Sequence, residues 1–310
     1  MKHKLLKHIT LIVMLVVGLT AHGQQDPMFT QYMNNPVILN PAYAGSHGAL
    51  NMNGIFRKQW VGFDWQPTTT SFSISSPFWK YHVGLGFSFV HDNIGPLSQS
   101  GVYFDYAYHL DLSEKSRLSL GLKAGFNYYE KDLRGLTTFE DDDWVNQIPV
   151  TSKFLFNTGI GAYYFNTNYF IGLSIPKLVR NSLSNDENTY ELIGREERHY
   201  YLTGGYLFDV NAILKLKPTA MLRIVNGAPA SFEITATAIL YEQLWAGLTY
   251  RVGDAFAAHF RIQINQNLQI GYSYDLNNSR LKKYNAGTHE IFISYTFYQQ
   301  GRRILSPRYF

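Results

Sequence analysis

The residues that could carry chemistry are scattered through this sequence, and the densest group of them is acidic. Glu140-Asp141-Asp142-Asp143 forms an unbroken run, and carboxylate oxygens are the ligands that Ca²⁺ prefers. The run lacks the ligand spacing and the glycine of a known calcium loop. An acidic, solvated loop is the better interpretation, and no metal site is predicted.

No catalytic motif is present. The sequence has no P-loop, no H-E-x-x-H and no G-x-S-x-G. It has no cysteine, which excludes thiolate metal sites and cysteine nucleophiles. Its ten histidines form no close ligand pair on one strand face. We therefore predict no enzyme activity and no cofactor. A hydrolase that assembles Ser and His from different strands stays open, because the sequence would not reveal it.

The composition favours a sheet protein or a membrane interface. Only 16% of the 310 residues are charged, against about 25% in ordinary globular proteins. Aromatic residues reach 16%, and they are enriched both in strands and at headgroup level in membranes. The net charge of +4 is spread along the chain, so the concentrated basic stripe of a nucleic-acid-binding protein is missing.

The N-terminus has the pattern of a secretory signal peptide. The first seven residues are rich in lysine, residues 9–19 are apolar, and Ala21-His22-Gly23 places small residues where a signal peptidase reads them. Cleavage is expected before Gln24. After that point no run of about 18 apolar residues occurs. The mature protein is therefore expected to have no transmembrane helix and to be periplasmic, secreted or in the outer membrane.

Apolar and polar residues alternate with a period of two along the rest of the chain, which predicts strands. In residues 255–265, for example, apolar residues occupy the even positions and His259 and Arg261 the odd ones. The alternation gives about fourteen segments of roughly 9–15 residues, close to the 9–11 that a tilted strand needs to cross a bilayer. We predict an all-β transmembrane outer-membrane barrel of about 14 antiparallel strands. The segments are 48–60, 67–77, 81–92, 99–111, 116–130, 154–166, 168–176, 197–210, 214–225, 230–240, 243–252, 255–265, 267–276 and 288–298.

The connections support a barrel as well. The three longest ones, about 131–153, 177–196 and 277–287, all have odd numbers in chain order, so they should lie at one end. Outer-membrane barrels have long outer loops and short periplasmic turns. Polar residues of the strands are expected to face the lumen: Arg57, Lys123, Glu233, Arg251, His259 and Arg261. Aromatic residues near the strand ends are expected in interface girdles: Trp60, Trp65, Trp79, Tyr103, Tyr108, Tyr163, Tyr164, Tyr200, Tyr201 and Tyr295.

Motifs at both ends of the chain resemble one known family. The stretch from Gln24 to Pro36, followed by Asn40-Pro41-Ala42-Tyr43-Ala44-Gly45-Ser46, is similar to the opening of the PorP/SprF family of Bacteroidota outer-membrane proteins. Arg57-Lys58-Gln59-Trp60-Val61-Gly62 resembles its R-x-Q-W-x-G stretch. The resemblance also covers three stretches near the C-terminus: Gly271-Tyr272-Ser273-Tyr274-Asp275, Gly287-Thr288-His289-Glu290-Ile291 and Ser306-Pro307-Arg308-Tyr309-Phe310.

The resemblance implies a non-enzymatic barrel of the type IX secretion and gliding-motility apparatus, in an outer membrane of the Bacteroidota type. It implies as partners the lipid bilayer, a large surface protein or adhesin engaged through its C-terminal domain, and periplasmic parts of the machinery. A porin-like channel for a small solute remains the alternative. The motif residues are Asp26, Pro27, Gln31, Tyr32, Asn40, Pro41, Tyr43 and Gly45 in the N-terminal stretch and Arg57, Trp60, Tyr272, Tyr274, Asp275, His289 and Glu290 in the barrel.

The chain thus divides into a signal peptide (1–23), an N-terminal periplasmic or plug segment (24–47), the barrel (48–298) and a periplasmic tail (299–310). Three prolines exclude both a helix and a central strand from residues 24–47. A merely flexible tail would not need Phe29, Tyr32 and Tyr43. We therefore expect the segment to fold into the lumen or against the periplasmic rim as a plug. A flexible periplasmic tail remains the alternative.

Overall fold

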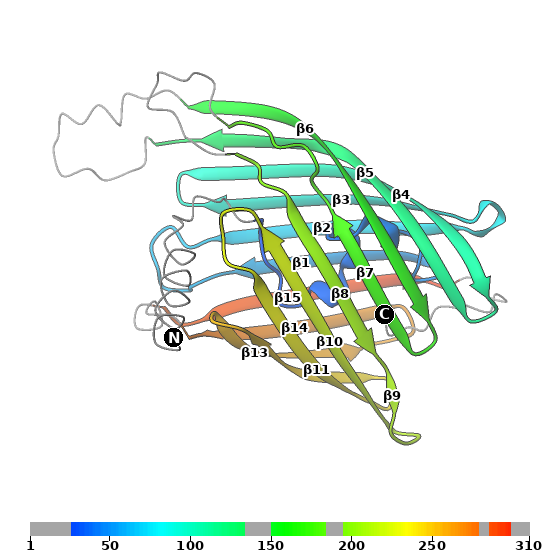
Figure 1. The fold of residues 1–310 in the computed structure, drawn as a ribbon. Coiled ribbons are helices and arrows are strands. Elements are labelled where there is room, and N and C mark those ends of the chain that lie inside the picture. The colour runs from blue at the N-terminus through cyan, green and yellow to red at the C-terminus, as the bar shows by residue number, and fades with distance from the viewer. Residues whose placement is uncertain (1–25, 134–149, 184–194, 279–284, 299–310) are drawn as a thin grey trace, which may run out of the picture.

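A computed structural model describes residues 26–133, 150–183, 195–278 and 285–298. The expected signal peptide, the acidic run at 140–143 and the tail at 299–310 lie outside these ranges. Within them, no helix is both long and apolar enough to cross a membrane. The described chain is a large antiparallel sheet, with short 3₁₀ helices (Figure 1).

The strands follow the predicted segments closely, because the period-two alternation ends where each turn begins. They are β1 (Leu50–Lys58), β2 (Thr68–Phe78), β3 (Val83–Ile94), β4 (Leu97–Ser113), β5 (Ser116–Lys131), β6 (Thr151–Asn166), β7 (Tyr169–Ile175), β8 (His199–Tyr206), β9 (Phe208–Asp209), β10 (Leu214–Val225), β11 (Ser231–Leu240), β12 (Leu244–Arg251), β13 (Ala255–Gln263), β14 (Leu268–Asn277) and β15 (Thr288–Phe297).

The sheet closes on itself. Each strand pairs with its neighbours in chain order, β1 pairs with β15, and β10 pairs with both β8 and β11. The two-residue strand β9 also pairs with β10 and continues the line of β8, so the wall has fourteen strands. A closed sheet leaves no unpaired edge, which is the condition for placing strands in hydrocarbon. The predicted barrel is confirmed.

The two ends of the barrel differ in the length of their connections. The long connections 132–150, 176–198 and 278–287 follow β5, β7 and β14, all at one end, which we call the long-loop end. The other end, which we call the short-turn end, has connections such as 114–115 and 167–168. Since long loops face outward in outer-membrane barrels, we infer that the long-loop end faces the cell exterior.

The two faces of the wall differ in polarity. Along β13, Phe256 and Phe260 are exposed on the outside, whereas His259 and Arg261 are buried inside. The outward side chains form an apolar surface suited to lipid. All six polar residues expected to face the lumen are buried there: Arg57, Lys123, Glu233, Arg251, His259 and Arg261.

The expected aromatic girdle was partly wrong. Tyr103, Tyr163 and Tyr201 are 6%, 4% and 3% exposed and face the interior. Tyr163 packs edge-on against Tyr43, with 5.3 Å between the ring centroids. A tyrosine's position in the strand alternation, rather than the chemistry of its ring, decides which side of the wall it occupies. Tyr108, by contrast, is on the outside.

Residues 26–49, which we call the N-terminal segment, lie inside the barrel (Figure 1). They contain the 3₁₀ helices η1 (Tyr32–Asn34), η2 (Pro36–Ile38) and η3 (Pro41–Tyr43). Asp26 contacts residues at the long-loop end. Ala44 lies against Gly84 at the short-turn end, where β1 then starts. The segment therefore passes through the lumen from one end to the other.

Candidate functional site

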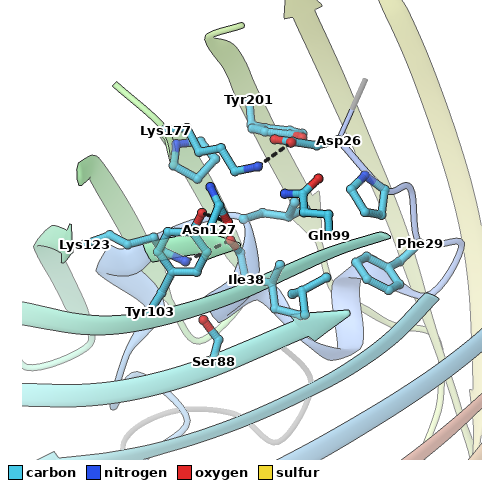
Figure 2. A pocket seen from close by; sticks show the side chains of 15 residues that line it. Asp26, Phe29, Ile38, Ser88, Gln99, Tyr103, Lys123, Asn127, Lys177 and Tyr201 are labelled. Carbon is cyan, nitrogen blue, oxygen red and sulfur yellow. Dashed lines mark hydrogen bonds and ion pairs between the residues drawn. The ribbon is translucent and has the colours of Figure 1, made fainter. Parts of the chain in front are cut away.

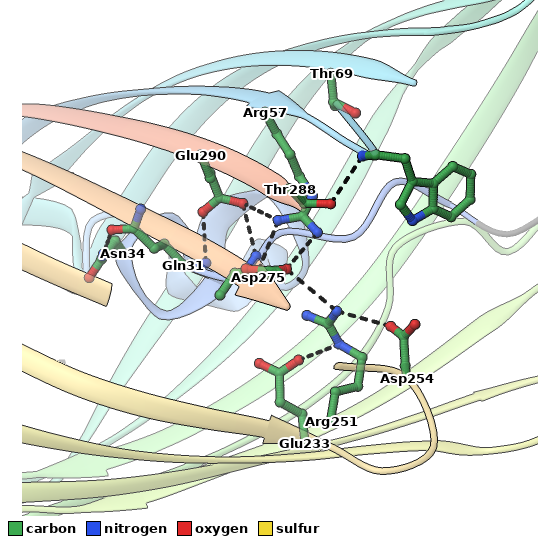
Figure 3. Close-up of polar contacts among 12 residues, drawn as sticks. Gln31, Asn34, Arg57, Thr69, Glu233, Arg251, Asp254, Asp275, Thr288 and Glu290 are labelled. Carbon is green, nitrogen blue, oxygen red and sulfur yellow. Dashed lines mark hydrogen bonds and ion pairs between the residues drawn. The ribbon is translucent and has the colours of Figure 1, made fainter. Parts of the chain in front are cut away.

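A buried arginine joins the N-terminal segment to the wall near the long-loop end. Arg57 on β1 is 1% exposed. Its Nη2 lies 2.8 Å from Oδ2 of Asp275, and its Nη1 lies 3.0 Å from Oε2 of Glu290 (Figure 3). Nη1 also donates to the hydroxyl of Thr30 at 2.8 Å. One guanidinium thus links two barrel carboxylates and the N-terminal segment.

The carboxylates bind the segment directly as well. Glu290 accepts hydrogen bonds from the backbone N–H groups of Thr30, at 2.9 Å, and Gln31, at 2.8 Å. The Thr30 hydroxyl donates to Asp275 at 2.6 Å. Hydrogen bonds to a charged acceptor are stronger than neutral ones. The segment is therefore held at this point through its backbone and through one small side chain.

A second arginine extends the same cluster. Nε of Arg251 lies 2.7 Å from Glu233 and Nη1 lies 3.1 Å from Asp254. Arg251 also approaches Asp275 at 3.9 Å. Figure 3 shows Asp275 between the two guanidinium groups. We call this set the Arg57 network: Arg57, Asp275, Glu290, Arg251, Glu233 and Asp254, with Thr30 and Gln31.

Strand pairing explains how residues so far apart in sequence meet. β14, β15 and β1 lie side by side, and Arg57 is the register partner of Glu290 across the β1–β15 seam. On the other side of β15, Asp275 pairs with Thr288, two residues before Glu290. Directly paired residues and residues two apart lie on the same face of a sheet, so all three charged side chains point inward. Closing the barrel between the first and last strands creates this site.

The second half of the segment lies on glycines of the inner wall. A Cβ atom at Gly121 would lie 2.1 Å from the backbone N of Ala42, and one at Gly84 would lie 1.9 Å from the carbonyl O of Ala44. A Cβ at Gly161 would lie 2.1 Å from Oδ1 of Asn40. Such distances are far below van der Waals contact. We call Gly84, Gly121 and Gly161 the glycine track, because only residues without a side chain let the segment approach the wall this closely.

Polar contacts fix the segment along this track. Asn40 donates through Nδ2 to the carbonyl O of Ala162 at 3.0 Å, and its Oδ1 accepts from the backbone N of Ala42 at the start of η3. Lys123 donates to the carbonyl O of Ile38 at 3.0 Å. These bonds give polar partners to backbone groups of the segment and of the wall inside the lumen.

At the long-loop end, Asp26 meets two basic groups. Nζ of Lys177 lies 2.6 Å from Asp26 Oδ1, and Nδ1 of His199 lies 3.4 Å from its Oδ2. Burial alone would raise the pKa of Asp26, but the two basic groups outweigh it and lower the pKa to about 2. The start of the segment is thus tied to the connection between β7 and β8 at physiological pH.

A small cavity lies beside this ion pair. Its volume is about 50 Å³, and its walls are mainly apolar, with Phe29 and Ile38 from the segment and Tyr103 and Tyr201 from the barrel (Figure 2). Lys177 crosses above it to Asp26. The cavity has room for only a few water molecules, so the described part of the lumen is largely filled here.

The β7–β8 connection is itself held by a buried glutamate. Glu196 accepts hydrogen bonds at 2.5–2.9 Å from four side chains that belong to β5, β6 and the connection. The donors are Asn127, Tyr129, Asn157 and Asn181. A carboxylate with four donors is well compensated for its burial. Glu196 could not be predicted from the sequence, because its donors come from separate elements.

The predicted motif residues occupy three places. Gln31, Arg57, Asp275 and Glu290 meet in the Arg57 network, and the backbone N of Trp60 donates to the nearby Thr288. In the lumen, Asp26 and Pro27 line the cavity of Figure 2, Tyr32 is buried, and Asn40, Pro41, Tyr43 and Gly45 lie along the glycine track. Tyr272, Tyr274 and His289 lie on the outer face, where the Tyr272 hydroxyl is 2.6 Å from His289 Nδ1.

Several members of the site were not predicted from the sequence. Thr30 lies inside the N-terminal motif, but its bonds to Arg57 and Asp275 depend on how the segment turns in the lumen. Arg251 and Glu233 were expected to face inward without being assigned to a site. The sequence signal that could have identified this pair is the presence of opposite charges on two successive strands. The strand register pairs the two residues directly. Among the described residues, no group of His, Asp and Glu side chains is arranged to hold a metal ion.

A closed barrel with an apolar outer face and a polar interior defines the class: this is an outer-membrane β-barrel protein. Within that class, the chain belongs to the family described as type IX secretion system membrane protein PorP/SprF, whose model matches residues 21–295. No curated protein matches the chain.

Solved structures similar to the chain are also outer-membrane barrels. The outer membrane protein Omp33 of Acinetobacter baumannii is 9% identical, with a TM-score of 0.47 over 80% of this chain and 99% of that one. The toluene transporter TbuX of Ralstonia pickettii is 10% identical, with a TM-score of 0.49 over 84% and 92%. A FadL homologue of Pseudomonas aeruginosa is 12% identical, with a TM-score of 0.44 over 90% and 96%. Likenesses this distant carry no argument about function.

The Arg57 network yields a stability prediction. Arg57→Gln leaves Asp275 and Glu290, both at most 1% exposed, without their shared cation. We expect the free energy of unfolding, measured by denaturant titration of the refolded barrel in lipid vesicles, to fall by about 3–5 kcal/mol. Lys58→Gln, at the next position of β1, is the control and should change it by less than about 0.5 kcal/mol. Equal stability of the two variants would contradict a structural role for the network.

The glycine track yields a second stability prediction. Gly121→Ala places a methyl group 2.1 Å from the Ala42 backbone, so the segment must move away from the wall. We expect a loss of about 1–3 kcal/mol in the same unfolding measurement, together with faster cleavage of the N-terminal segment by added protease. In Gly204→Ala the new methyl meets nothing closer than 3.5 Å, and this control should behave like the native chain. An unchanged cleavage rate in Gly121→Ala would contradict the track.

Proposed function

We propose that this chain is a non-enzymatic outer-membrane barrel of the type IX secretion and gliding apparatus that assists the export or surface attachment of a large surface protein or adhesin. Family membership supports the link to this secretion system. The observation that carries the rest is the filled lumen. The N-terminal segment runs through it and is bonded to the wall by the Arg57 network. A barrel filled in this way is suited to presenting surfaces to partners rather than to passing a solute.

We further propose that the N-terminal segment acts as a plug. Phe29, Tyr32 and Tyr43, which a flexible tail would not need, are each at most 5% exposed. Thr30 and Gln31 are fully buried at the network. These burials support a segment that folds together with the barrel.

The two ends then offer separate places for the two kinds of partner. The long-loop end, with its extended connections, is where we place the C-terminal domain of the surface protein. The short-turn end is where we place the periplasmic components. Both assignments rest on the orientation inferred from loop length.

Deletion of the gene tests the function. We expect one large surface protein to disappear from the protease-accessible fraction of intact cells while other outer-membrane proteins stay at their normal level. The same protein should co-purify with the tagged barrel from detergent-solubilised outer membranes. Complementation with Lys58→Gln is the control for expression. A deletion strain that keeps all its surface proteins and loses uptake of a small solute would contradict the proposal and favour the porin-like alternative.

Conductance tests the plug separately. In a planar bilayer, we expect the native barrel to show little conductance and a variant lacking residues 26–46 to show open-channel steps several times larger. The reason is that the segment fills the lumen between its two ends. Gly204→Ala serves as the variant control. Equal conductance of the native barrel and the variant without residues 26–46 would contradict a plug. That result would leave the proposed role in secretion unchanged.

A further inference from the structure

A row of polar side chains crosses the outer face of the barrel near the long-loop end. The strands from β14 through β15 and β1 to β4 contribute one residue each, and each residue is the register partner of the next. Directly paired residues lie on the same face of a sheet. Since Arg57 points inward, its neighbour Lys58 and the rest of the row point outward. We call it the outer polar row: Tyr274, His289, Lys58, Thr68, Asn93 and Ser98.

The row marks one limit of the apolar outer face. The next outward positions toward the middle of the wall include Ile291 and Phe56, and Ile293 and Phe72 follow them. These four side chains are 40–52% exposed, as expected for a surface that contacts hydrocarbon. Since the long-loop end is inferred to face the exterior, the row lies at the level where the headgroups of the outer leaflet begin.

The charge of the row has one sign. Lys58 and His289 are direct register partners, and Lys58 makes no ion pair with the described residues. The acidic residues of the strands β14, β15, β1, β2 and β3 all face the interior, and they are Asp275, Glu290 and Asp92. Two basic side chains directly opposite one another repel when both are charged, so an anion held between them offsets that repulsion.

Two tyrosines of β14 hold His289 in place. Its Nδ1 lies 2.6 Å from the hydroxyl of Tyr272, and its ring centroid lies 5.1 Å from that of Tyr274. The Tyr274 hydroxyl donates to the carbonyl O of Ala286 at 2.9 Å. Gly287, with a φ of +91°, leaves room for the Tyr274 ring, because a Cβ atom there would lie 2.6 Å from it. When the Tyr272 hydroxyl donates to Nδ1, the ring proton lies on Nε2, which has no hydrogen-bond partner among the described residues and can donate to a ligand.

We propose that the outer polar row binds the phosphate group of a lipid in the outer leaflet. Lys58 supplies a charge, His289 an N–H donor and Thr68 a hydroxyl, and a phosphate accepts hydrogen bonds from all three kinds of group. The exposed apolar side chains between the row and the middle of the wall supply the surface for the acyl chains of the same lipid. Basic groups at headgroup level attract anionic lipids, whereas a girdle of aromatic rings alone would need neither Lys58 nor His289.

The outer polar row faces away from the lumen, so this proposal does not depend on the role in secretion proposed above. Stability in vesicles without a phosphate-monoester lipid and export of a surface protein do not report on the row. Lys58→Gln therefore serves as a control in both of those measurements.

Calorimetric titration of the full barrel in mixed detergent micelles, at constant ionic strength, tests the site. The probes are dipalmitoyl phosphatidic acid, dipalmitoylglycerol (the same chains without the phosphate), inorganic phosphate and acetyl-Gly-Glu-Gly-amide. We expect saturable binding of phosphatidic acid, about tenfold or more tighter than that of dipalmitoylglycerol, and weaker binding of inorganic phosphate, which lacks the chains. Equal binding of the two lipids, or inorganic phosphate bound as tightly as phosphatidic acid, overturns the proposal. Tighter binding of the acidic peptide also overturns it and assigns the row to a protein partner.

Variants locate the binding. Lys58→Gln and His289→Gln should each weaken the binding of phosphatidic acid about tenfold and leave that of dipalmitoylglycerol unchanged, as expected for the loss of one hydrogen bond to a charged group. Tyr272→Phe, which removes the hydroxyl that orients His289, should weaken it about threefold. Lys80→Gln, in the exposed connection between β2 and β3 at the short-turn end, removes the same charge and should bind like the native chain. Native affinity in folded Lys58→Gln or His289→Gln, or an equal loss in Lys80→Gln, overturns the proposal.

Discussion

The ion pairs of Arg57 are the interaction on which the rest of the interior depends. They join the first strand, the last two strands and the N-terminal segment at one point. Removing either the guanidinium or the carboxylates of such a buried pair leaves an uncompensated charge and is strongly destabilising. Neither half of the site is therefore complete until β1 has paired with β15 and the segment has entered the lumen. The site is therefore complete only when the wall is closed and the segment lies in the lumen.

The glycine track is a second constraint on the interior, and it acts through shape rather than charge. Side chains at Gly84, Gly121 and Gly161 would overlap the segment, so these inner-wall positions must stay empty for the segment to lie flat. Glycine weakens a strand by about 0.5–1 kcal/mol relative to alanine. The close contact with the segment explains why glycine occupies three wall positions opposite it. Charge fixes the segment near the long-loop end, and close packing fixes it near the other.

The period-two alternation was enough to predict the strand order, the closed wall and the inward position of residues such as Arg251 and Glu233. It failed for Tyr103, Tyr163 and Tyr201, because their chemistry suggested a membrane interface while their parity placed them inside. The resemblance of motifs at both ends of the chain selected Arg57, Asp275 and Glu290, but their meeting follows only from the register of β1 with β15. Glu196 could not be predicted, since its four donors are brought together by the path of a connection.

The filled lumen bears on how such a protein can act. A channel for a polar solute needs a continuous polar path, whereas here many polar groups of the interior are bonded to the chain's own N-terminal segment. Moving that segment would uncover Asp275, Glu290 and the glycine track together, and those groups would then need water or a partner strand in its place. A partner that displaces the segment would have to replace the two backbone N–H donors of Glu290 or leave their place to water. An extended polypeptide offers such donors, and a small apolar solute does not.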